Sequence, residues 1–376
     1  MAEILLTIFF ISVLLFFLGS GVWVAISMIG VSSIGMMLFT TRPVGDAMAT
    51  TIWGASSSWT LTALPLFVWM GEILFRTKLS ENLFEGLSPW MQKLPGGLIH
   101  VNVVGCALFA AISGSSAATV ATVGKMSIPE LRKRKYPENI LLGSLAGSGT
   151  LGLLIPPSII LIIYGVTVQE SIAKLFIAGI LPGIMIALIF MAYVMIWSII
   201  NKKSMPIFYK NYSFTEKVRK SGKLLPVILL IISVIGSIYT GIATATEAAS
   251  LGVVGALILS YFQKSLTIKT FKESLLGATK TSCMIAFILA GATFLSLAMG
   301  FTGLPRNLAI WIQSMELSPY VLIFVLMIFY IILGMFLDGI SAVVLTMAII
   351  EPMIRQAGFD MIWFGVFLVI VVEMAQ

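Results

Sequence analysis

The stretch from Gly105 to Pro157 sets the strongest constraint on what this chain can fold into. Its first apolar run is interrupted by the small polar residues Ser113–Ser116, and its second ends in Pro156 and Pro157. Two consecutive prolines remove two N–H donors and clash with the preceding helical turn, while clusters of glycine and serine weaken a helix. The sequence therefore predicts two interruptions within segments that are otherwise apolar and helical.

The composition places these interruptions inside a membrane. The chain has 376 residues, of which 59% are hydrophobic and 10% are charged, and its mean hydropathy is +1.06. A membrane-spanning helix needs about 20 apolar residues, so the apolar runs leave room for roughly nine or ten spans, some of them re-entrant. The strand alternation of a membrane β-barrel is absent from the sequence. We therefore expect an all-α polytopic membrane protein.

Interrupted helices at membrane depth indicate a class of function. Backbone groups that a break releases are tolerated in a bilayer only where protein or a water-filled cavity satisfies them. Two such breaks in one chain are typical of the substrate or ion site of a secondary transporter. The net charge of +7 does not favour nucleic acid as a partner, because the basic residues lie in the loops between apolar runs.

The sequence lacks the residue patterns of the main intramembrane enzymes. It has no paired intramembrane catalytic aspartates, no HExxH motif and only one histidine, His100. Cys106 and Cys283 both lie in apolar context, so they indicate neither a disulfide framework nor a metal cluster. We therefore expect a protein that is not an enzyme and has no cofactor.

Three segments carry the predicted interruptions. Residues 98–124 break at the serines into halves too short to span, which predicts a re-entrant helical hairpin. Residues 139–166 form a helix broken at the two prolines. Residues 320–354 are interrupted at Asp338–Ser341, which predicts a second hairpin. An amphipathic segment precedes each hairpin, at 79–93 and, as a short interfacial helix, at 305–315.

Four basic segments give the orientation. Residues 76–93, 125–138, 201–223 and 263–280 hold most of the 23 lysines and arginines. If they lie on one side of the membrane, the positive-inside rule makes that side cytoplasmic. The N-terminus then lies on the opposite side.

The two halves of the chain show signs of an internal repeat. At a shift of 225 positions, Gly114 aligns with Gly339, and Ser116 aligns with Ser341. The order of elements also agrees, and the two copies begin on opposite sides of the membrane. We therefore predict inverted-topology repeats, the first at residues 1–223 and the second at 224–376, an architecture that permits alternating access.

The repeat also predicts where a second broken helix belongs. Pro129 aligns with Pro352 at a shift of 223, and the same shift places the counterpart of Pro156 and Pro157 just beyond Gln376. We therefore expect the second repeat to be truncated in this sequence.

Five stretches of the sequence together form a specific pattern: Leu64–Phe67 with Gly71 and Glu72, Leu94–Gly97, Ser113–Ala117, Leu154–Ser158 and Ala243–Ala249. With these stretches, the sequence resembles the large membrane subunit of TRAP (tripartite ATP-independent periplasmic) transporters over essentially the whole chain. The family usually has proline where Ala245 stands, but the flanking threonines and glutamate are present.

The resemblance implies Na⁺-coupled uptake of organic acids, such as C4-dicarboxylates or sugar acids, across the bacterial inner membrane. It implies two partners besides membrane lipids: a small four-helix membrane subunit, expected as a separate polypeptide, and a periplasmic substrate-binding protein. The hairpins and broken helices would form a transport domain that moves as an elevator against a scaffold. Na⁺ would be the coupling ion, with no other cofactor.

The resemblance also implies ligand sets made of oxygen atoms, which suit a hard cation. The first sodium site would use Ser113 and Ser115 with the carbonyls of Gly152, Ile155 and Pro157. The alternative for the serine cluster is the close packing of small residues between membrane helices. For the prolines, the alternative is a simple kink.

The second sodium site would use Asp338, Gly339 and Ser341 with carbonyls near Ala375. An ionised carboxylate at a hairpin tip is costly unless a cation pairs with it, but Asp338 could instead cap the following half-helix. The half-helix N-termini at Ser116 and Ser341 carry partial positive charge and would attract a substrate carboxylate.

Three other functions remain open. A stand-alone Na⁺/dicarboxylate elevator carrier would share the hairpins and proline breaks but would need no binding protein. A membrane-embedded enzyme is disfavoured by the missing catalytic patterns described above. A passive channel is disfavoured because inverted broken hairpins suit moving gates better than a fixed filter.

Overall fold

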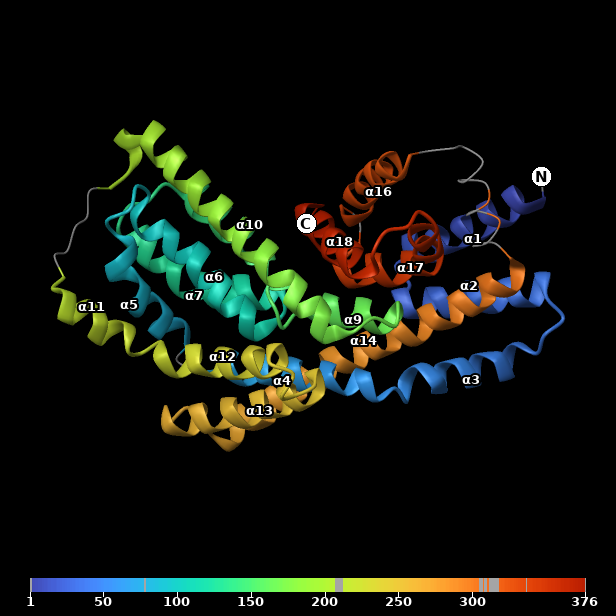
Figure 1. The fold of residues 1–376 in the computed structure, drawn as a ribbon, viewed down its shortest axis with the longest axis horizontal. Helices are drawn as coiled ribbons and strands as arrows, with labels where there is room; N and C mark the ends of the chain where they lie inside the picture. Colours follow the sequence, from blue (N-terminus) through green and yellow to red (C-terminus); the bar gives the residue numbers. More distant parts are fainter. Residues whose placement is uncertain are drawn as a thin grey trace. The chain divides into compact units, whose positions relative to one another are not determined.

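Helices account for all the regular secondary structure in the computed structural model, which describes residues 2–77, 79–206, 212–303, 307, 310, 318–335 and 337–375 (Figure 1). The chain folds into two compact units. Unit 1 comprises Met1–Leu61, Ile163–Ser171 and Thr281–Gln376, and unit 2 comprises Thr62–Ile162 and Ile172–Lys280. The predicted division into repeats at residue 223 stays a prediction, because compactness does not test internal repetition.

Unit 2 contains the first predicted hairpin. Its helices pack in pairs: α4 lies against α13, and α6, α7 and α8 contact one another, with α10 along α6 (Figure 1). Its elements are α4 (Ala63–Phe75), α5 (Leu79–Met91), η2 (Gly97–Ile99), α6 (His100–Ser113), α7 (Ser116–Lys133), α8 (Glu138–Gly149), η3 (Thr150–Leu153), α10 (Ile172–Ile200), η4 (Lys202–Ser204), α11 (Phe214–Ser221), α12 (Leu225–Tyr239) and α13 (Ala245–Phe262).

Unit 1 contains the second predicted hairpin. Here α18 packs against both α16 and α17, while α2 packs against α1 and α3. Its elements are α1 (Ala2–Gly19), α2 (Val24–Phe39), α3 (Val44–Ser56), η1 (Trp59–Thr62), α16 (Pro319–Gly334), α17 (Gly339–Gln356) and α18 (Met361–Ala375). Helices α9 (Ile159–Thr167) and α14 (Ile268–Thr302) contribute residues to both units, and Thr62 at the end of η1 belongs to unit 2.

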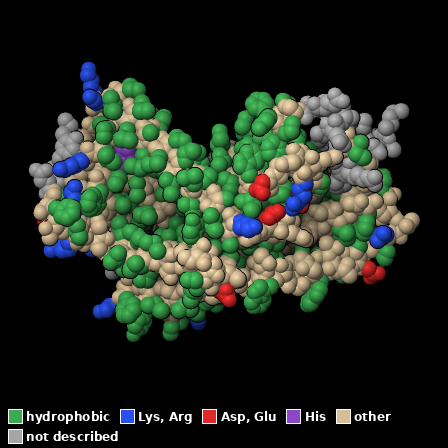
Figure 2. Space-filling view, viewed as in Figure 1, with side chains coloured by type: hydrophobic (Ala, Val, Ile, Leu, Met, Phe, Trp, Pro, Cys, Tyr) green, Lys and Arg blue, Asp and Glu red, His purple; other side chains and the backbone are tan. Residues whose placement is uncertain are grey.

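The all-α polytopic character predicted from composition is confirmed. Within the described ranges, four helices are long and apolar enough to cross a membrane, and counting each of two bent pairs as one span raises this to six. The estimate from sequence was larger because it counted every apolar run, including runs that fold as short helices such as α6 and α16. Hydrophobic side chains cover much of the face drawn in Figure 2.

Two basic segments expected as loops are largely helical. Helix α7 continues to Lys133 through Pro129, and α14 begins at Ile268, before the apolar run. A proline within a helix removes one hydrogen bond and leaves one carbonyl without a donor. At a membrane edge water can satisfy that carbonyl, so the helix does not have to end there. The predicted helix at 305–315 falls mostly outside the described residues.

Candidate ion-binding and substrate-binding sites

The tip of the first hairpin is a left-handed turn at Gly114. Its φ angle is +59°, a conformation that L side chains rarely adopt. A Cβ atom at this position would lie 2.6 Å from the carbonyl oxygen of Pro157. The backbone N–H of Ile159 donates to the Gly114 carbonyl at 3.4 Å. Only glycine therefore allows the tip to pack directly onto the chain that follows the proline pair.

Hydroxyl groups form a network inside this tip. The Oγ atom of Ser113 lies 2.9 Å from Oγ1 of Thr119, and Thr119 Oγ1 donates to the carbonyl of Ser115 at 2.7 Å. Ser115 has extended backbone geometry and caps α7, but its Oγ accepts from the N–H of Ala118 at a long 3.5 Å. The Ser115 hydroxyl is therefore only weakly engaged in capping. Ser116, the first residue of α7, is half-buried.

The helix break facing this tip is held by one side chain. Ser158 Oγ donates to the carbonyl of Leu153 and accepts from the N–H of Leu161 at 3.3 Å, which bridges the end of η3 and the start of α9. In the described part of the chain, no backbone N–H reaches the carbonyl oxygens of Ile155 or Pro157. These are polar atoms that a break in a membrane helix must satisfy by other means.

The break and the tip meet at Gly152 as well. A Cβ atom there would lie 2.7 Å from both the carbonyl carbon and oxygen of Ser115. Four of the five residues predicted for the first site are therefore neighbours: Gly152 touches Ser115, and Pro157 touches Gly114 beside Ser113. The fifth, Ile155, lies on the break between Gly152 and Pro157.

Helix α4 supports the same tip from another side. A Cβ atom on Gly71 would lie 3.1 Å from the Cα atom of Ser113 and 3.3 Å from the carbonyl oxygen of Ile112. Gly71 belongs to one of the stretches that match the TRAP family, and its small size lets α4 approach the end of α6 closely. The first tip is thus enclosed by the proline break and by α4.

The tip of the second hairpin is organised by a carboxylate. Asp338 Oδ1 accepts from Ser341 Oγ at 2.5 Å, and Oδ2 accepts from the Ser341 N–H at 3.2 Å. Asp338 is thus the N-cap of α17, the alternative that the sequence left open for it. The Asp338 side chain is exposed, whereas Gly339 and Ser341 are buried.

Ala375 lies beside the end of α16. Its Cβ is 2.6 Å from the position that a Cβ on Gly334 would take. Gly334 is the last residue of α16 and precedes Asp338 by four positions, so α18 reaches the second hairpin close to its tip. The structure gives no direct contact between Ala375 and Asp338, and the ligand set predicted here is therefore brought together less closely than the first.

Several buried polar residues near the hairpins were not singled out from the sequence. Thr119 is fully buried and lies one helical turn after Ser115, a spacing that could have revealed it. Tyr330 of α16 and Thr346 of α17 share a hydrogen bond of 2.6 Å. Glu373, on α18, is 6% exposed and stands out in the sequence as an acid within a long apolar run.

An ion network lies at the far end of the second hairpin. Arg355 contacts Glu351 at 2.9 Å and Glu170 at 3.7 Å, and it donates to the carbonyl of Val168 at 3.1 Å. Tyr164 donates to the carbonyl of Met361 at 2.6 Å in the same unit. These contacts tie the end of α9 to α17 and to the start of α18.

Comparison with known proteins identifies the family. The model for "Tripartite ATP-independent periplasmic transporter, DctM component" matches residues 10–376. The chain belongs to this family. It is therefore a TRAP transporter large subunit and a multi-pass protein of the bacterial inner membrane, as the sequence motifs predicted.

TRAP large permeases of other bacteria resemble this chain along most of its length. The C4-dicarboxylate permease DctM of Pseudomonas aeruginosa is 32% identical over 90% of this chain and 78% of its own. The 2,3-diketo-L-gulonate permease YiaN of Escherichia coli is 32% identical, over 86% and 76%. The sialic acid permease SiaM of Vibrio cholerae is 30% identical, over 92% and 81%. These relatives are named as transporter permeases, not enzymes.

Proposed function

We propose that this TRAP large subunit carries out Na⁺-coupled uptake of an organic acid by an elevator mechanism, using substrate delivered by a periplasmic binding protein. The relatives named for C4-dicarboxylates, sialic acid and diketogulonate all handle carboxylates, which supports an organic acid as the substrate class. A fused relative from Oleidesulfovibrio alaskensis, named permease protein DctMQ, supports a small membrane subunit as a partner.

The packing of the Gly114 tip onto the proline break carries the proposal for the first sodium site. It brings the backbone of Ser115 against Gly152 and the tip at Gly114 against the carbonyl of Pro157. Among the described residues, no backbone N–H donates to the carbonyls of Ile155 or Pro157. A hard cation prefers oxygen ligands, and carbonyl and hydroxyl oxygens supply them without a fixed charge. Sodium would act here as the coupling ion, with no other cofactor.

The second proposed site differs because it includes a charge. Asp338 holds Ser341 through both carboxylate oxygens, and each of these oxygens retains lone pairs for a cation. Gly339, Ser341 and carbonyls near Ala375 would complete the site. The N-terminal turns of α7 at Ser116 and of α17 at Ser341 would attract a substrate carboxylate through their partial positive charge.

Uptake into proteoliposomes tests this function. The full-length protein is reconstituted with its small membrane subunit and offered radiolabelled organic acids, with or without binding protein, under inward Na⁺ or K⁺ gradients. We expect uptake to require both Na⁺ and the binding protein, and to fall in Ser115→Ala. Uptake that needs no binding protein would instead assign the protein to the stand-alone carriers. Uptake driven equally by K⁺ would contradict the proposed sodium sites.

A further inference from the structure

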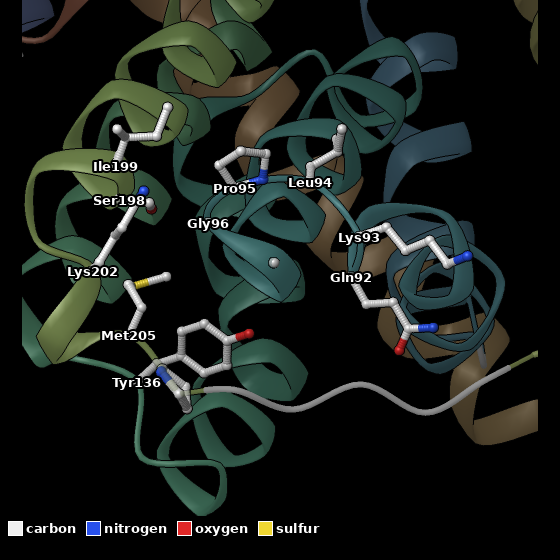
Figure 3. A pocket seen from close by; sticks show the side chains of 12 residues that line it. Gln92, Lys93, Leu94, Pro95, Gly96, Tyr136, Ser198, Ile199, Lys202 and Met205 are labelled. Carbon is white, nitrogen blue, oxygen red and sulfur yellow. The ribbon is translucent and has the colours of Figure 1, made fainter.

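A cavity of about 550 Å³ lies in unit 2, and none of its lining residues belongs to the first hairpin tip. Figure 3 shows the turn from Gln92 to Gly96 on one side of it and, on the other, Ser198 at the end of α10 and Lys202 in the η4 turn that follows. We call it the Gly96 pocket. Its lining residues are Gln92, Lys93, Leu94, Pro95, Gly96, Gly97, Tyr136, Ser198, Ile199, Lys202, Met205 and Pro206.

The walls of the pocket are fixed by close packing. Gly96 has a φ angle of +103°, and a Cβ there would lie 2.7 Å from Val194 Cγ1 and 3.1 Å from Ser198 Oγ. His100 Nε2 donates to the carbonyl of Pro95 at 2.7 Å, and the Tyr136 hydroxyl accepts from the N–H of Leu98 at 3.1 Å. The turn is therefore held against α10 in one conformation before any ligand arrives.

One polar group in the pocket has no partner. Ser198 is 4% exposed, and its Oγ makes no hydrogen bond within the described residues. A buried hydroxyl without a partner costs free energy, so such a group in a cavity wall marks a place for a polar ligand. Gln92 and Tyr136, both more than nine-tenths buried, add further polar atoms to the lining.

The charge of the pocket is positive. Lys93 and Lys202 line it from opposite sides, and no acidic side chain of the described residues does so. Neither lysine takes part in an ion pair in the described part of the chain. Both belong to the basic segments that the positive-inside rule assigns to the cytoplasmic side, where anionic lipids attract lysine.

An apolar surface leads from the pocket along α10. Ile196, Ile199 and Ile200 are 58%, 51% and 76% exposed, and Ile199 itself lines the pocket. Exposed apolar residues continue toward the middle of this 29-residue helix, including Leu188 and Ile189. A molecule with a polar, anionic head and long hydrocarbon chains would place its head in the pocket and its chains along this surface.

We propose that the Gly96 pocket binds the phosphate headgroup of an anionic phospholipid from the cytoplasmic leaflet, with its acyl chains along α10. Lys93 and Lys202 neutralise the phosphate, and Ser198 donates a hydrogen bond to a headgroup oxygen. The bound lipid would hold the turn that follows α5 against the end of α10. This proposal rests on the membrane location of the chain and not on sodium coupling.

Lipid titration followed by native mass spectrometry tests the site. The delipidated full-length protein in detergent is titrated with phosphatidylglycerol, and the Kd of the tightest bound lipid is measured. Each lysine near an anionic lipid contributes about 1 kcal/mol, so we expect Lys93→Gln/Lys202→Gln to raise this Kd about thirty-fold. Ser198→Leu, which removes the unpartnered hydroxyl and places a larger apolar side chain in the pocket wall, should also weaken the tight binding.

Matched controls separate the site from general charge effects. Lys203 follows Lys202 directly but does not line the pocket, so Lys203→Gln should leave the Kd unchanged. Equal loss in Lys202→Gln and Lys203→Gln would overturn the proposal. So would phosphatidylethanolamine binding as tightly as phosphatidylglycerol, or glycerol 3-phosphate competing at similar concentration, since the pocket would then select the chains alone or a free phosphate. Both lysines are exposed, so these variants should fold even if Ser198→Leu does not.

Discussion

Each hairpin tip turns the chain and caps the helix that follows, but the two tips do so with different residues. The first turns at a left-handed glycine and gathers neutral hydroxyls, with Ser115 capping α7 through a long 3.5 Å contact. The second uses Asp338, which caps α17 through two hydrogen bonds to Ser341 of 2.5 and 3.2 Å. In the proposed sodium sites, a neutral tip would depend on backbone carbonyls from the neighbouring segment to hold a cation, whereas a charged tip would attract one itself. Substitutions that disturb packing should therefore impair the first tip most, and substitutions that remove charge should impair the second tip most.

The largest expected effect is on the packing of the first tip. Gly114→Ala forces a side chain into a left-handed conformation, at a cost of roughly 1–2 kcal/mol, and into contact with the Pro157 carbonyl. We expect thermal stability in detergent to fall by several degrees and uptake to be lost. The matched control is Gly143→Ala on α8, where a Cβ meets no atom within 4 Å. If both variants behaved alike, the tight fit between tip and break would be wrong.

A charge test separates the two roles of Asp338. Asparagine caps helices about as well as aspartate, so Asp338→Asn should leave stability nearly unchanged. Loss of a carboxylate from a cation site should raise the Na⁺ concentration for half-maximal uptake about ten-fold, equivalent to roughly 1.4 kcal/mol. The measurement is uptake as a function of Na⁺ in proteoliposomes. An unchanged Na⁺ dependence would leave Asp338 with the capping role alone.

The next effect compares the two caps directly. An N-cap serine or aspartate contributes typically about 1 kcal/mol, and Asp338 makes the shorter contacts. We therefore expect Asp338→Ala to lower the melting temperature more than Ser115→Ala does. Ser115→Ala should instead act mainly on Na⁺ affinity. A larger stability loss in Ser115→Ala than in Asp338→Ala would reverse the comparison.

The sequence predicted the positions of the helix breaks better than the residues that contact those breaks. The helix ends at Ser113 and Leu153 follow from local residue types, because glycine, serine and consecutive prolines act on their own turns. The contact between Gly114 and Pro157 involves residues far apart in the chain, and only the resemblance to the family suggested it. Thr119 and Ser158 were missed because hydroxyls in apolar helices usually bond to their own backbone. Asp338 was ambiguous because capping and cation binding need the same residue type.

Reasoning from local residue types also led to a wrong expectation for the length of α7. Charge density suggested a loop after residue 124, but α7 continues to Lys133 because lysine and arginine are good helix formers wherever water is available. The Gly96 pocket could not be predicted from local residue types at all. Its walls come from the turn between α5 and α6 and from the end of α10, and no short motif joins them.

The smallest expected effect concerns the ion pairs between arginine and glutamate at the end of each hairpin that lies away from its tip. After the first, Arg132 contacts Glu138 at 2.7 Å; in the second, Arg355 contacts Glu351 at 2.9 Å. The hydrogen bond from Arg132 lowers the pKa of Glu138 below its ordinary value of 4.5, and the same contact raises the pKa of Arg132. Because the folded-state pKa of Glu138 is depressed, the pair stabilises the protein above about pH 4.5 and loses this contribution as pH falls through the lowered value.

Both side chains of the first pair are more than half exposed, so solvent and salt screen it strongly. We expect Glu138→Gln to lower the melting temperature only slightly at neutral pH and low salt. The difference from the unmodified protein should shrink as pH falls below 4.5, and it should vanish at high salt. Glu351→Gln should have the larger effect, because Glu351 is 27% exposed and Arg355 also contacts Glu170 and the Val168 carbonyl. A larger effect of Glu138→Gln would show that burial and network size do not set the strength of these pairs.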